Sequence, residues 1–340
     1  MKKCIALAKQ GLGTTYPNPL VGAVILHKGK VIGSGWHQKA GGAHAEVHAI
    51  NDVKEPSLLV ESTLIVNLEP CSHHGKTPPC ADLIIRSGIK HVVIGTQDPF
   101  EEVQGKGIQK LIDAGIRVDM EVEKEECLAL NKRFFTFVKK KRPYIILKWA
   151  ESLDGYIAPI QKSETTPYWI SQLPARKLVH KWRSEEQAIL IGKNTALTDN
   201  PSLTTRLHKG PSPVRVLIDP KGKVNRCAKI FDNNQKTIVF TDTRQPSVNQ
   251  IEYIAVDFTK NAVKQICDVL YHKNIQSLLI EGGRITIQHF IDANLWDEAR
   301  IITGKKTLIT GVKSPNISSF TNKKGSYKLG EDLIDIWIND

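Results

Sequence analysis

The chain has 340 residues, of which 41% are hydrophobic and 24% are charged, and its 47 Lys and Arg against 35 Asp and Glu give a formal net charge of +12. This composition excludes collagen-like, low-complexity and wholly disordered chains. At about 100–200 residues per domain, the length predicts two domains that each bury a core of their own.

Neither a membrane span nor a disulfide scaffold is expected. No window approaches the roughly 18 consecutive apolar residues of a membrane-spanning helix, and residues 1–6 begin an amphipathic helix pattern rather than the apolar core of a signal peptide. The six cysteines are sparse over this length, whereas disulfide scaffolds are typical of short secreted chains. The sequence therefore predicts a cytoplasmic protein with reduced thiols and no membrane partner.

The positive charge has two interpretations. A nucleic-acid-binding protein is expected to concentrate its basic residues on one face, but here they are spread along the chain apart from the run at 139–142. The same field would attract a small anionic ligand such as a phosphorylated sugar or a dinucleotide. We therefore expect a small-molecule ligand and no nucleic-acid partner, and the sequence leaves a homo-oligomer open.

Helical and strand-like patterns alternate in the first half, which is typical of a sheet with helices packed on its faces. Pro143 cannot continue a helix, so we place a domain boundary there, giving residues 1–142 and 143–340. The expected helices are 2–9, one that begins near His44, 81–86, 106–114 and one long helix at 123–140. The expected strands are a hairpin of 21–26 and 30–36, followed by 63–68, 91–95 and 116–121.

The second half shows the same alternation and predicts a second α/β domain. The expected strands are 144–149, 187–191, 214–218, 237–240, 251–256, 277–280 and 298–303, and the expected helices are 171–183, 262–271 and 285–293. The segment 313–328 is rich in Lys, Ser, Asn and Gly and is expected to be a surface loop before a last apolar run at 333–338.

A candidate metal site lies in the first half, at His44, Cys71 and Cys80. Imidazole nitrogen and thiolate sulfur are ligands that zinc prefers, so these residues would supply three of them. A structural zinc has four protein ligands, whereas a catalytic zinc with three keeps one position for water, whose pKa falls from about 15.7 toward 7. His44 and Cys71 are both expected at the start of a helix, where the helix dipole favours thiolate and hydroxide.

Glu46 is the candidate proton carrier. It follows His44 by two residues, so we expect its carboxylate near the metal without coordinating it. His-x-Glu followed by Pro-Cys and a further Cys is the arrangement of zinc deaminases, in which the Glu is acid and base rather than ligand. Here eight residues, 72–79, separate the two cysteines instead of two. These features together predict a catalytic zinc.

Two other readings of this pattern stay open. His48, His73, His74 or Cys4 would close a structural zinc site as a fourth ligand, and the chain would then be a zinc-stapled nucleic-acid-binding module. A nucleoside or RNA-base deaminase with an unrelated second domain would instead keep the open metal position.

Several segments of the first half match the pattern of a known family: 15–22, 35–41, 44–49, 68–80, Gln97-Asp98-Pro99 and Gly105-Lys106-Gly107. They resemble the deaminase half of the bifunctional riboflavin-biosynthesis deaminase/reductase, in which the longer spacing between the cysteines is the family's own variant. The resemblance implies that one Zn²⁺ is bound by His44, Cys71 and Cys80 and that Glu46 carries the proton. It further implies that the pyrimidine and its phosphoribosyl arm are faced by Asn18, His37, His73, His74 and Lys76. An Asn offers a donor and an acceptor to a ring edge, and a Lys is a point charge for phosphate.

The second half has a weaker motif of its own. Gly282-Gly283 stands between an expected strand and an expected helix, where a helix N-terminus can hold pyrophosphate oxygens. No full Gly-x-Gly-x-x-Gly fingerprint accompanies it, so a tight turn is an equal explanation. The family resemblance continues, however, through Leu147-Lys148, 152–155, 169–171, 175–176, Arg183, 188–190, 194–206, 214–219 and 280–283.

These segments resemble the reductase half of the same family. The resemblance implies a cytidine-deaminase-like three-layer α/β/α domain followed by a dihydrofolate-reductase-like α/β domain. It also implies NADPH as the cofactor, in a nicotinamide site formed by Ala150, Trp169, Thr195, Asp199 and Gly283. The implied substrate residues are Arg183, Leu203, Arg206 and Glu281, and paired donors on an arginine suit a phosphate.

The sequence departs from the family at three places in this half. Pro167 and Pro220 stand where a small hydroxyl residue is usual, and because Pro has no backbone donor, ligand contacts there are not carried over. Thr303-Gly304-Lys305-Lys306 stands where a proline-containing strand end is more typical.

The resemblance implies two reactions on a phosphorylated pyrimidine. The first is the zinc-dependent hydrolytic deamination of 2,5-diamino-6-(5-phosphoribosylamino)pyrimidin-4-one. The second is the NADPH-dependent reduction of the ribosyl side chain to ribityl. The nicotinamide cofactor brings the chemistry of the second step, and the protein is expected to align the reactants and exclude water.

Overall fold

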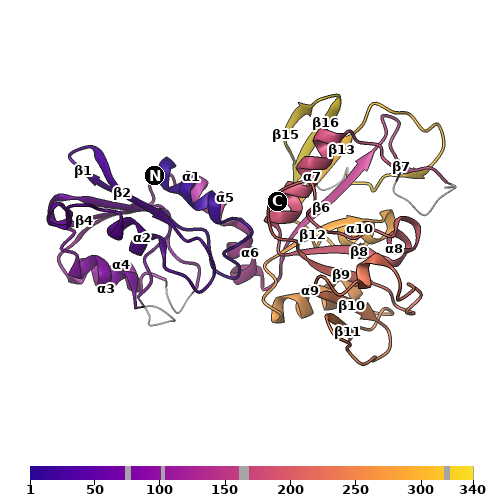
Figure 1. The fold of residues 1–340 in the computed structure, drawn as a ribbon, viewed down its shortest axis with the longest axis horizontal. Helices are drawn as coiled ribbons and strands as arrows, with labels where there is room; N and C mark the ends of the chain where they lie inside the picture. Colours follow the sequence, from indigo (N-terminus) through magenta and orange to yellow (C-terminus); the bar gives the residue numbers. More distant parts are fainter. Residues whose placement is uncertain (73–77, 101–103, 161–167, 318–321, 340) are drawn as a thin grey trace. The chain divides into compact units, whose positions relative to one another are not determined.

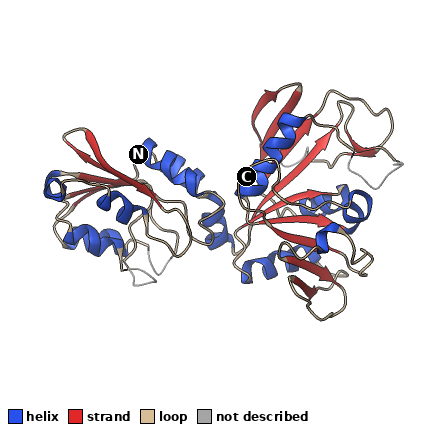
Figure 2. Cartoon of the chain, in the orientation of Figure 1, coloured by secondary structure: helices blue, strands red, loops and turns tan. Residues whose placement is uncertain are grey.

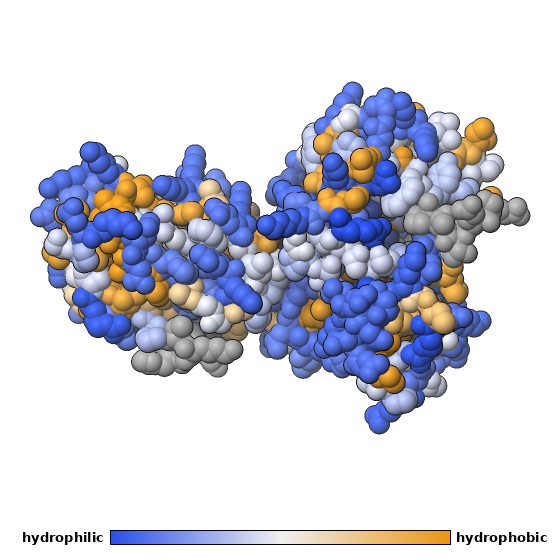
Figure 3. Space-filling model, viewed as in Figure 1, coloured by the Kyte–Doolittle hydropathy of each residue, from blue (hydrophilic) through white to orange (hydrophobic). Residues whose placement is uncertain are grey.

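The computed structural model describes residues 1–72, 78–100, 104–160, 168–317 and 322–339. It divides into two compact units, Met1–Lys141 and Arg142–Asp340, each with its own sheet and core (Figure 1). This division lies beside the boundary that Pro143 suggested. Among the described residues no helix is long and apolar enough to cross a membrane. Hydrophilic residues cover much of the face of each unit that Figure 3 shows.

The first unit is built on a five-stranded sheet with the order β2-β1-β3-β4-β5. β1 is antiparallel to both β2 and β3, whereas β3, β4 and β5 are parallel to one another. Parallel neighbours require crossover connections, which the helices of this unit provide. The strands are β1 (Gly22–His27), β2 (Lys30–Trp36), β3 (Thr63–Val66), β4 (His91–Ile94) and β5 (Arg117–Asp119).

Helices cover both faces of this sheet, so the unit has three layers (Figure 2). α2, α3 and α4 share one apolar core with the strands, and α1 and α5 form a smaller core on the other face. Two glycines allow close approach, because a Cβ at Gly22 would meet the backbone of α1 at Cys4 and one at Gly35 would meet α2 at His48. The helices are α1 (Lys2–Ala8), α2 (Ala45–Asn51), α3 (Cys80–Arg86), α4 (Lys106–Asp113), α5 (Lys124–Leu130) and α6 (Lys132–Lys140).

The second unit is built on a nine-stranded sheet with the order β11-β10-β9-β8-β12-β6-β13-β16-β15. The strands from β11 to β13 are parallel, and only the pairs β13–β16 and β16–β15 are antiparallel. The strands of this sheet are β6 (Tyr144–Glu151), β8 (Ala188–Gly192), β9 (Val214–Ile218), β10 (Thr237–Thr241), β11 (Ile251–Ala255), β12 (Ser277–Gly282), β13 (Glu298–Thr303), β15 (Asn322–Leu329) and β16 (Asp332–Ile338). A separate small pair joins β7 (Tyr156–Ala158) and β14 (Val312–Lys313).

Alternation along β6 sends side chains to two cores. Ile145 and Leu147 pack with α9 and α10 on one face, whereas Tyr144 and Ile146 pack with α7 and α8 on the other. Lys148 follows Ile146 by two positions, so its side chain lies on the same face of the sheet, the face that α7 covers. The helices are α7 (Leu173–Glu185), α8 (Lys193–Asp199), α9 (Ala262–His272) and α10 (Arg284–Asp292).

Several elements differ from the sequence prediction, including the short strands β7 and β14, which were not predicted. The long helix expected at 123–140 is two helices, α5 and α6, which meet at Asn131. The loop expected at 313–328 is confirmed at 314–317 but is wrong from residue 322, because β15 occupies Asn322–Leu329 and pairs with β16. Its residues are nearly all exposed, so it lacks the apolar alternation by which strands are detected. The short helix α8 was not predicted.

Candidate active sites

The three expected metal ligands of the first unit lie together. His44 Nδ1 is 3.2 Å from Cys80 Sγ and 3.5 Å from Cys71 Sγ, and all three atoms lie within 4.8 Å of one another. A tetrahedral zinc with its usual bond lengths holds nitrogen and sulfur ligands about 3.5 Å apart. The three donor atoms are therefore close enough together to bind a single zinc ion.

Two helix termini place these ligands. His44 is the residue before α2, and Cys80 is the first residue of α3. The expectation that Cys71 begins a helix was wrong, because Cys71 lies in the loop after β3 and its Sγ accepts the backbone N–H of Cys80 at 3.3 Å. The thiolate at Cys71 is thus stabilised by the start of α3, although Cys71 is not part of that helix.

Glu46 lies in the first turn of α2 and is 3% exposed. It is not a member of the ligand group, and its Oε2 is buried with no hydrogen-bond partner among the described residues. Burial, reinforced by the charge of Cys71, raises the pKa of Glu46 to about 7. A buried carboxyl oxygen without a partner beside a metal site is the arrangement that a proton carrier needs.

The pKa values of the two thiols in the group are shifted in opposite directions. Hydrogen bonding from the Cys80 thiol lowers the pKa of Cys71 to about 4, and the same contact raises the pKa of Cys80. A metal ion needs deprotonated sulfur ligands, so Cys71 is prepared for binding.

Asn18 and His37 lie beside this group. Asn18 Nδ2 is 3.0 Å from His37 Nε2, and His37 Nδ1 is 3.0 Å from the carbonyl oxygen of Ala43. A carbonyl only accepts, so the ring proton of His37 is on Nδ1 and its Nε2 accepts from Asn18. The ring of His37 meets the ring of His44 edge to face, with centroids 5.5 Å apart.

Of the remaining candidates of this unit, Cys4 and His48 do not join the group. His73, His74 and Lys76 lie outside the described residues. Cys4 is on α1, where its thiol donates to the carbonyl of Ile65. Among the residues that the structure describes, the metal group thus holds three members, and neither Cys4 nor His48 is a fourth.

Glu69 is a residue that the sequence analysis did not single out. Its carboxylate accepts four backbone N–H groups at 3.0–3.4 Å, those of Asp98, Gly105, Gly107 and Ile108. A Cβ at Gly107 would lie 2.0 Å from the carbonyl oxygen of Pro70, so this approach requires glycine. Glu69 therefore ties the segment of Cys71 to the start of α4, which accounts for the Gly105-Lys106-Gly107 motif.

The second unit has a cavity of about 1510 Å³ at the carboxyl ends of its parallel strands. Ligands bind at this end of open parallel sheets, and the volume exceeds the roughly 1,000 Å³ that suffices for one drug-sized molecule. All nine residues expected in this half line it: Ala150, Trp169, Arg183, Thr195, Asp199, Leu203, Arg206, Glu281 and Gly283. The cavity therefore has room for a dinucleotide and a second ligand. Of the positions where the chain departs from the family, Pro220 also lines it and Pro167 lies outside the described residues.

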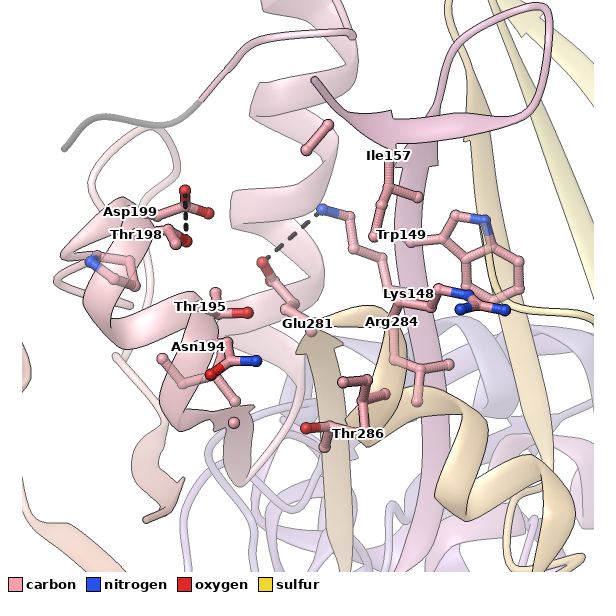
Figure 4. A pocket seen from close by; sticks show the side chains of 18 of the residues that line it. Lys148, Trp149, Ile157, Asn194, Thr195, Thr198, Asp199, Glu281, Arg284 and Thr286 are labelled. Carbon is pink, nitrogen blue, oxygen red and sulfur yellow. Dashed lines mark hydrogen bonds and ion pairs between the residues drawn. The ribbon is translucent and has the colours of Figure 1, made fainter. Parts of the chain in front are cut away.

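A buried charge cluster forms one wall of the cavity. Arg183 Nε and Nη2 donate to the two carboxylate oxygens of Glu281 at 2.8 and 2.7 Å, and Lys148 Nζ lies 3.7 Å from Glu281 Oε2. Figure 4 shows Lys148 and Glu281 facing each other from neighbouring strands, while α8 presents Thr195 and Asp199 across the cavity. Burial would raise the pKa of Glu281, but Arg183 and Lys148 outweigh it and hold this pKa at about 2.

Arg183 and Arg206 differ in their freedom to bind a ligand. Arg183 also donates through Nη1 to the carbonyl of Thr204, so three of its N–H groups are already used. Arg206 is exposed, and within the described part of the chain its guanidinium donates to Ser202 Oγ at 2.8 Å. Arg206 is therefore the better placed of the two for an incoming phosphate.

Leu203 has a strained backbone in the same wall. Its φ is 55°, a left-handed conformation that is unusual for a branched side chain, and the residue is 2% exposed. Such conformations persist where the surroundings fix them, often at ligand sites. The turn it forms carries Arg206, whose backbone N–H donates to Nδ1 of the buried His180.

The turn at Gly282 and Gly283 fits a nucleotide. A Cβ at Gly283 would lie 3.0 Å from Thr195 Oγ1, and Gly282 has a φ of 142°, which favours glycine. These glycines leave the space between α8 and the start of α10 open for a ligand that approaches the backbone closely. The residues present therefore suit a dinucleotide.

Comparison with known proteins agrees with both sites. Residues 143–334 match the family described as RibD C-terminal domain, and residues 1–96 match the cytidine and deoxycytidylate deaminase zinc-binding region. The chain is 39% identical to the riboflavin biosynthesis protein RibD of Aquifex aeolicus, over 98% of this chain and 96% of that protein. The chain belongs to the RibD family.

A solved structure extends this likeness to the whole chain. It is that of a diaminohydroxyphosphoribosylaminopyrimidine deaminase/5-amino-6-(5-phosphoribosylamino)uracil reductase from Thermotoga maritima, which is 38% identical with a TM-score of 0.91. The match covers 100% of this chain and 97% of that one. RibD of Acinetobacter baumannii is 30% identical with a TM-score of 0.90.

Membership in the RibD family confirms the main predictions from the sequence. The chain is a bifunctional deaminase and reductase of riboflavin biosynthesis, with a cytidine-deaminase-like domain and a dihydrofolate-reductase-like domain. Its cofactors are Zn²⁺ and NADPH, and its substrate is a small pyrimidine. The reading with an unrelated second domain is wrong, because the second half matches the RibD C-terminal domain.

Two residues of the RibD reductase half were not predicted as functional. Lys148 follows a run of four apolar residues in β6 and its side chain is 13% exposed, and His180 is 4% exposed on α7. Lys148 could have been found from the sequence. A lysine in an apolar strand is expected to have a charged partner, because buried lysines are rare unless paired. The burial of His180 depends on the fold of the turn around Leu203, so no local pattern marks it.

Proposed function

We propose that the first unit deaminates 2,5-diamino-6-(5-phosphoribosylamino)pyrimidin-4-one and that the second unit reduces the ribosyl side chain of the product to ribityl. One observation carries this function. Three ligand atoms that fit one zinc ion lie next to the buried carboxylate of Glu46, whose Oε2 has no partner among the described residues. Three ligands from the described residues would leave a bound zinc one position for water, with Glu46 beside it as proton carrier.

In the deaminase step His44, Cys71 and Cys80 would hold the zinc, which supplies an activated water when bound. The ring carbon gains a bond to the water oxygen and loses its bond to the amino nitrogen, which leaves as ammonia. A proton must therefore pass from the water to the nitrogen, and the Glu46 carboxylate is placed to carry it. Asn18 offers its carbonyl oxygen to the pyrimidine, because its Nδ2 is held by His37.

The loop residues His73, His74 and Lys76 are proposed to complete this substrate site on the strength of the family resemblance alone. In the reductase step Ala150, Trp169, Thr195, Asp199 and Gly283 would bind NADPH, which supplies a hydride when bound. The substrate would lie against Arg183, Leu203, Arg206 and Glu281. The part of the chain in this step is to hold the two reactants in line and exclude water.

We further propose that the enzyme acts in the cytoplasm, without nucleic-acid or membrane partners. None of the six cysteines, all of which lie in the described residues, forms a disulfide, which suits a reducing compartment. A homo-oligomer remains compatible with this function.

A coupled assay tests the function. Ammonia release and NADPH absorbance are followed with the phosphorylated diaminopyrimidine as substrate, and both signals are expected from the intact chain. Cys71→Ser is expected to lose zinc and ammonia release but to keep NADPH oxidation on the deaminated substrate, because one of three ligands is gone from the first unit only. Cys227→Ser, which changes an exposed cysteine, is the control and should keep both. Ammonia release by zinc-free Cys71→Ser would contradict the proposed site.

Arg206→Gln tests the phosphate site of the reductase half. A charge-assisted hydrogen bond contributes about 1.5–3 kcal/mol, so KM for the phosphorylated substrate should rise about 10- to 100-fold. KM for NADPH should stay unchanged. Arg226→Gln is the matched control, because its guanidinium lies 4.5 Å from the ring centroid of Tyr253 and it does not line the cavity. An unchanged KM for the phosphorylated substrate in Arg206→Gln would place the phosphate elsewhere.

A further inference from the structure

α5 ends at Leu130 and α6 begins at Lys132, and Asn131 stands between them with φ −99° and ψ 19°. Asn131 stands before the first residue of α6, where an asparagine side chain ordinarily caps its own helix, yet it makes no such capping bond. It is 2% exposed. Its side chain instead bonds a residue far away in the sequence, in the loop before β1.

The contact is a pair of hydrogen bonds to one residue. The backbone N–H of Leu20 donates to Asn131 Oδ1 at 2.8 Å, and Asn131 Nδ2 donates to the carbonyl oxygen of Leu20 at 2.9 Å. The side-chain amide thus pairs with both backbone groups of Leu20, as a neighbouring strand would do. Both bonds are buried, so their loss would leave polar groups without a partner.

A second asparagine holds the same stretch from the sheet. Asn67, just after β3 and fully buried, donates through Nδ2 to the carbonyl oxygen of Leu20 at 2.9 Å. Its Oδ1 accepts the backbone N–H of Gly22 at 2.7 Å. The chain on either side of residue 21 is therefore fixed by two side-chain amides from two different elements.

This stretch carries the residue that faces the pyrimidine. Asn18 precedes Leu20 by two residues, with Pro19 between them, so little backbone freedom separates the two. Asn18 donates to His37 Nε2 at 3.0 Å, and the ring of His37 lies against the ring of the metal ligand His44. A displacement of Leu20 would therefore be passed on to Asn18 and change where its carbonyl oxygen points.

We infer that Asn131 is a positioning residue of the deaminase half, which clamps Leu20 so that Asn18 meets the substrate beside the metal. The inference rests on the proposed deaminase function. It assigns a purpose to the asparagine at the junction of the two helices, whose side chain caps neither helix and bonds Leu20 instead.

Asn131→Asp and Asn131→Ala test the clamp. Asp has the same shape but sets an oxygen against the Leu20 carbonyl, and Ala removes both bonds. Each is expected to raise KM for the diaminopyrimidine about tenfold, since a lost buried hydrogen bond costs about 1–3 kcal/mol. Zinc content and NADPH oxidation on the deaminated substrate should stay at the level of the unaltered chain.

Ile84→Val is the control that separates a loss of stability from a loss of substrate positioning. It removes one buried methyl from α3, which costs about 0.5–1.5 kcal/mol of stability without touching the loop of Asn18. This variant should unfold more easily but keep the KM of the unaltered chain. An equal rise of KM in Ile84→Val, or a KM within twofold of the unaltered chain in both Asn131 variants, would overturn the inference.

A double-mutant cycle decides whether the clamp acts through Asn18. If it does, Asn131→Ala should add little to the KM of Asn18→Ala, because both changes remove the same substrate contact. Fully additive effects would refute the inference. Should an Asn131 variant lose zinc, Asn67→Asp, which weakens the same hold on Leu20 from the sheet, replaces it in the cycle. Ammonia release by the unaltered chain is measured in the same series, and its absence would refute the deaminase function rather than the clamp.

Discussion

Glu46→Gln is expected to abolish deamination while the rest of the enzyme survives. The amide has the size of the carboxyl but cannot accept and deliver a proton, and general acid–base catalysis contributes about 10²- to 10⁴-fold. Ammonia release should therefore fall by at least about a hundredfold. Because Glu46 is outside the ligand group, zinc content should stay unchanged, and NADPH oxidation on the deaminated substrate should continue.

Glu55→Gln is the matched control for this experiment. It makes the same chemical change at an exposed residue before the short helix at Pro56–Glu61, so both activities should be retained. Ammonia release by Glu46→Gln at the rate of the unaltered chain would remove Glu46 from the reaction. It would also revive the reading in which the zinc is only structural.

Much of the metal site could be predicted because its signal is local. His44 and Glu46 are two residues apart, and Pro70 directly precedes Cys71, so the chemistry of a zinc deaminase is visible without knowing the fold. The strands of the second unit were also largely predicted, since buried parallel strands appear as short apolar runs. The ranges 214–218 and 298–303 agree with β9 and β13 at both ends.

What the sequence did not reveal depends on contacts between distant residues. Asn131, between α5 and α6, hydrogen-bonds the backbone of Leu20, which lies 111 positions away in the sequence. Lys148 is tolerated within β6 because Glu281 approaches it from β12. The polar strand β15 exists because it pairs with β16, although nearly all its residues are exposed. In each case the cause is a tertiary partner that no window of the sequence contains.

The two halves also use their buried carboxylates in opposite ways. Burial and the nearby Cys71 raise the pKa of Glu46 to about 7, as suits a group that exchanges protons. The Glu281 side chain is 7% exposed, but Arg183 and Lys148 hold its pKa at about 2, so it stays charged and organises the cations around it. The same side chain is thus a proton carrier in one unit and a fixed anion in the other.

Glu281→Gln is therefore expected to destabilise the second unit strongly. The neutral amide cannot compensate the positive charges of Arg183 and Lys148. Removing one partner of a buried ion pair lowers the free energy of unfolding by about 3–5 kcal/mol. Reduction of the deaminated substrate should be lost or severely weakened, whereas ammonia release by the first unit should persist. Chemical unfolding of the full chain, followed with both activities, measures this loss.

The pH dependence of the same variant identifies the cause. The pKa of Glu281 in the folded chain, about 2, lies below its ordinary value, so its contribution is complete above pH of about 4.5 and is lost as the pH falls through 2. The stability difference between the unaltered chain and Glu281→Gln should thus be largest near neutral pH and shrink in acid. Glu252→Gln is the control, because Glu252 also pairs with two lysines, Lys236 and Lys273, but is about one third exposed and should cost less than about 1 kcal/mol. A loss in Glu281→Gln no larger than in Glu252→Gln would show that Arg183 and Lys148 do not depend on this carboxylate.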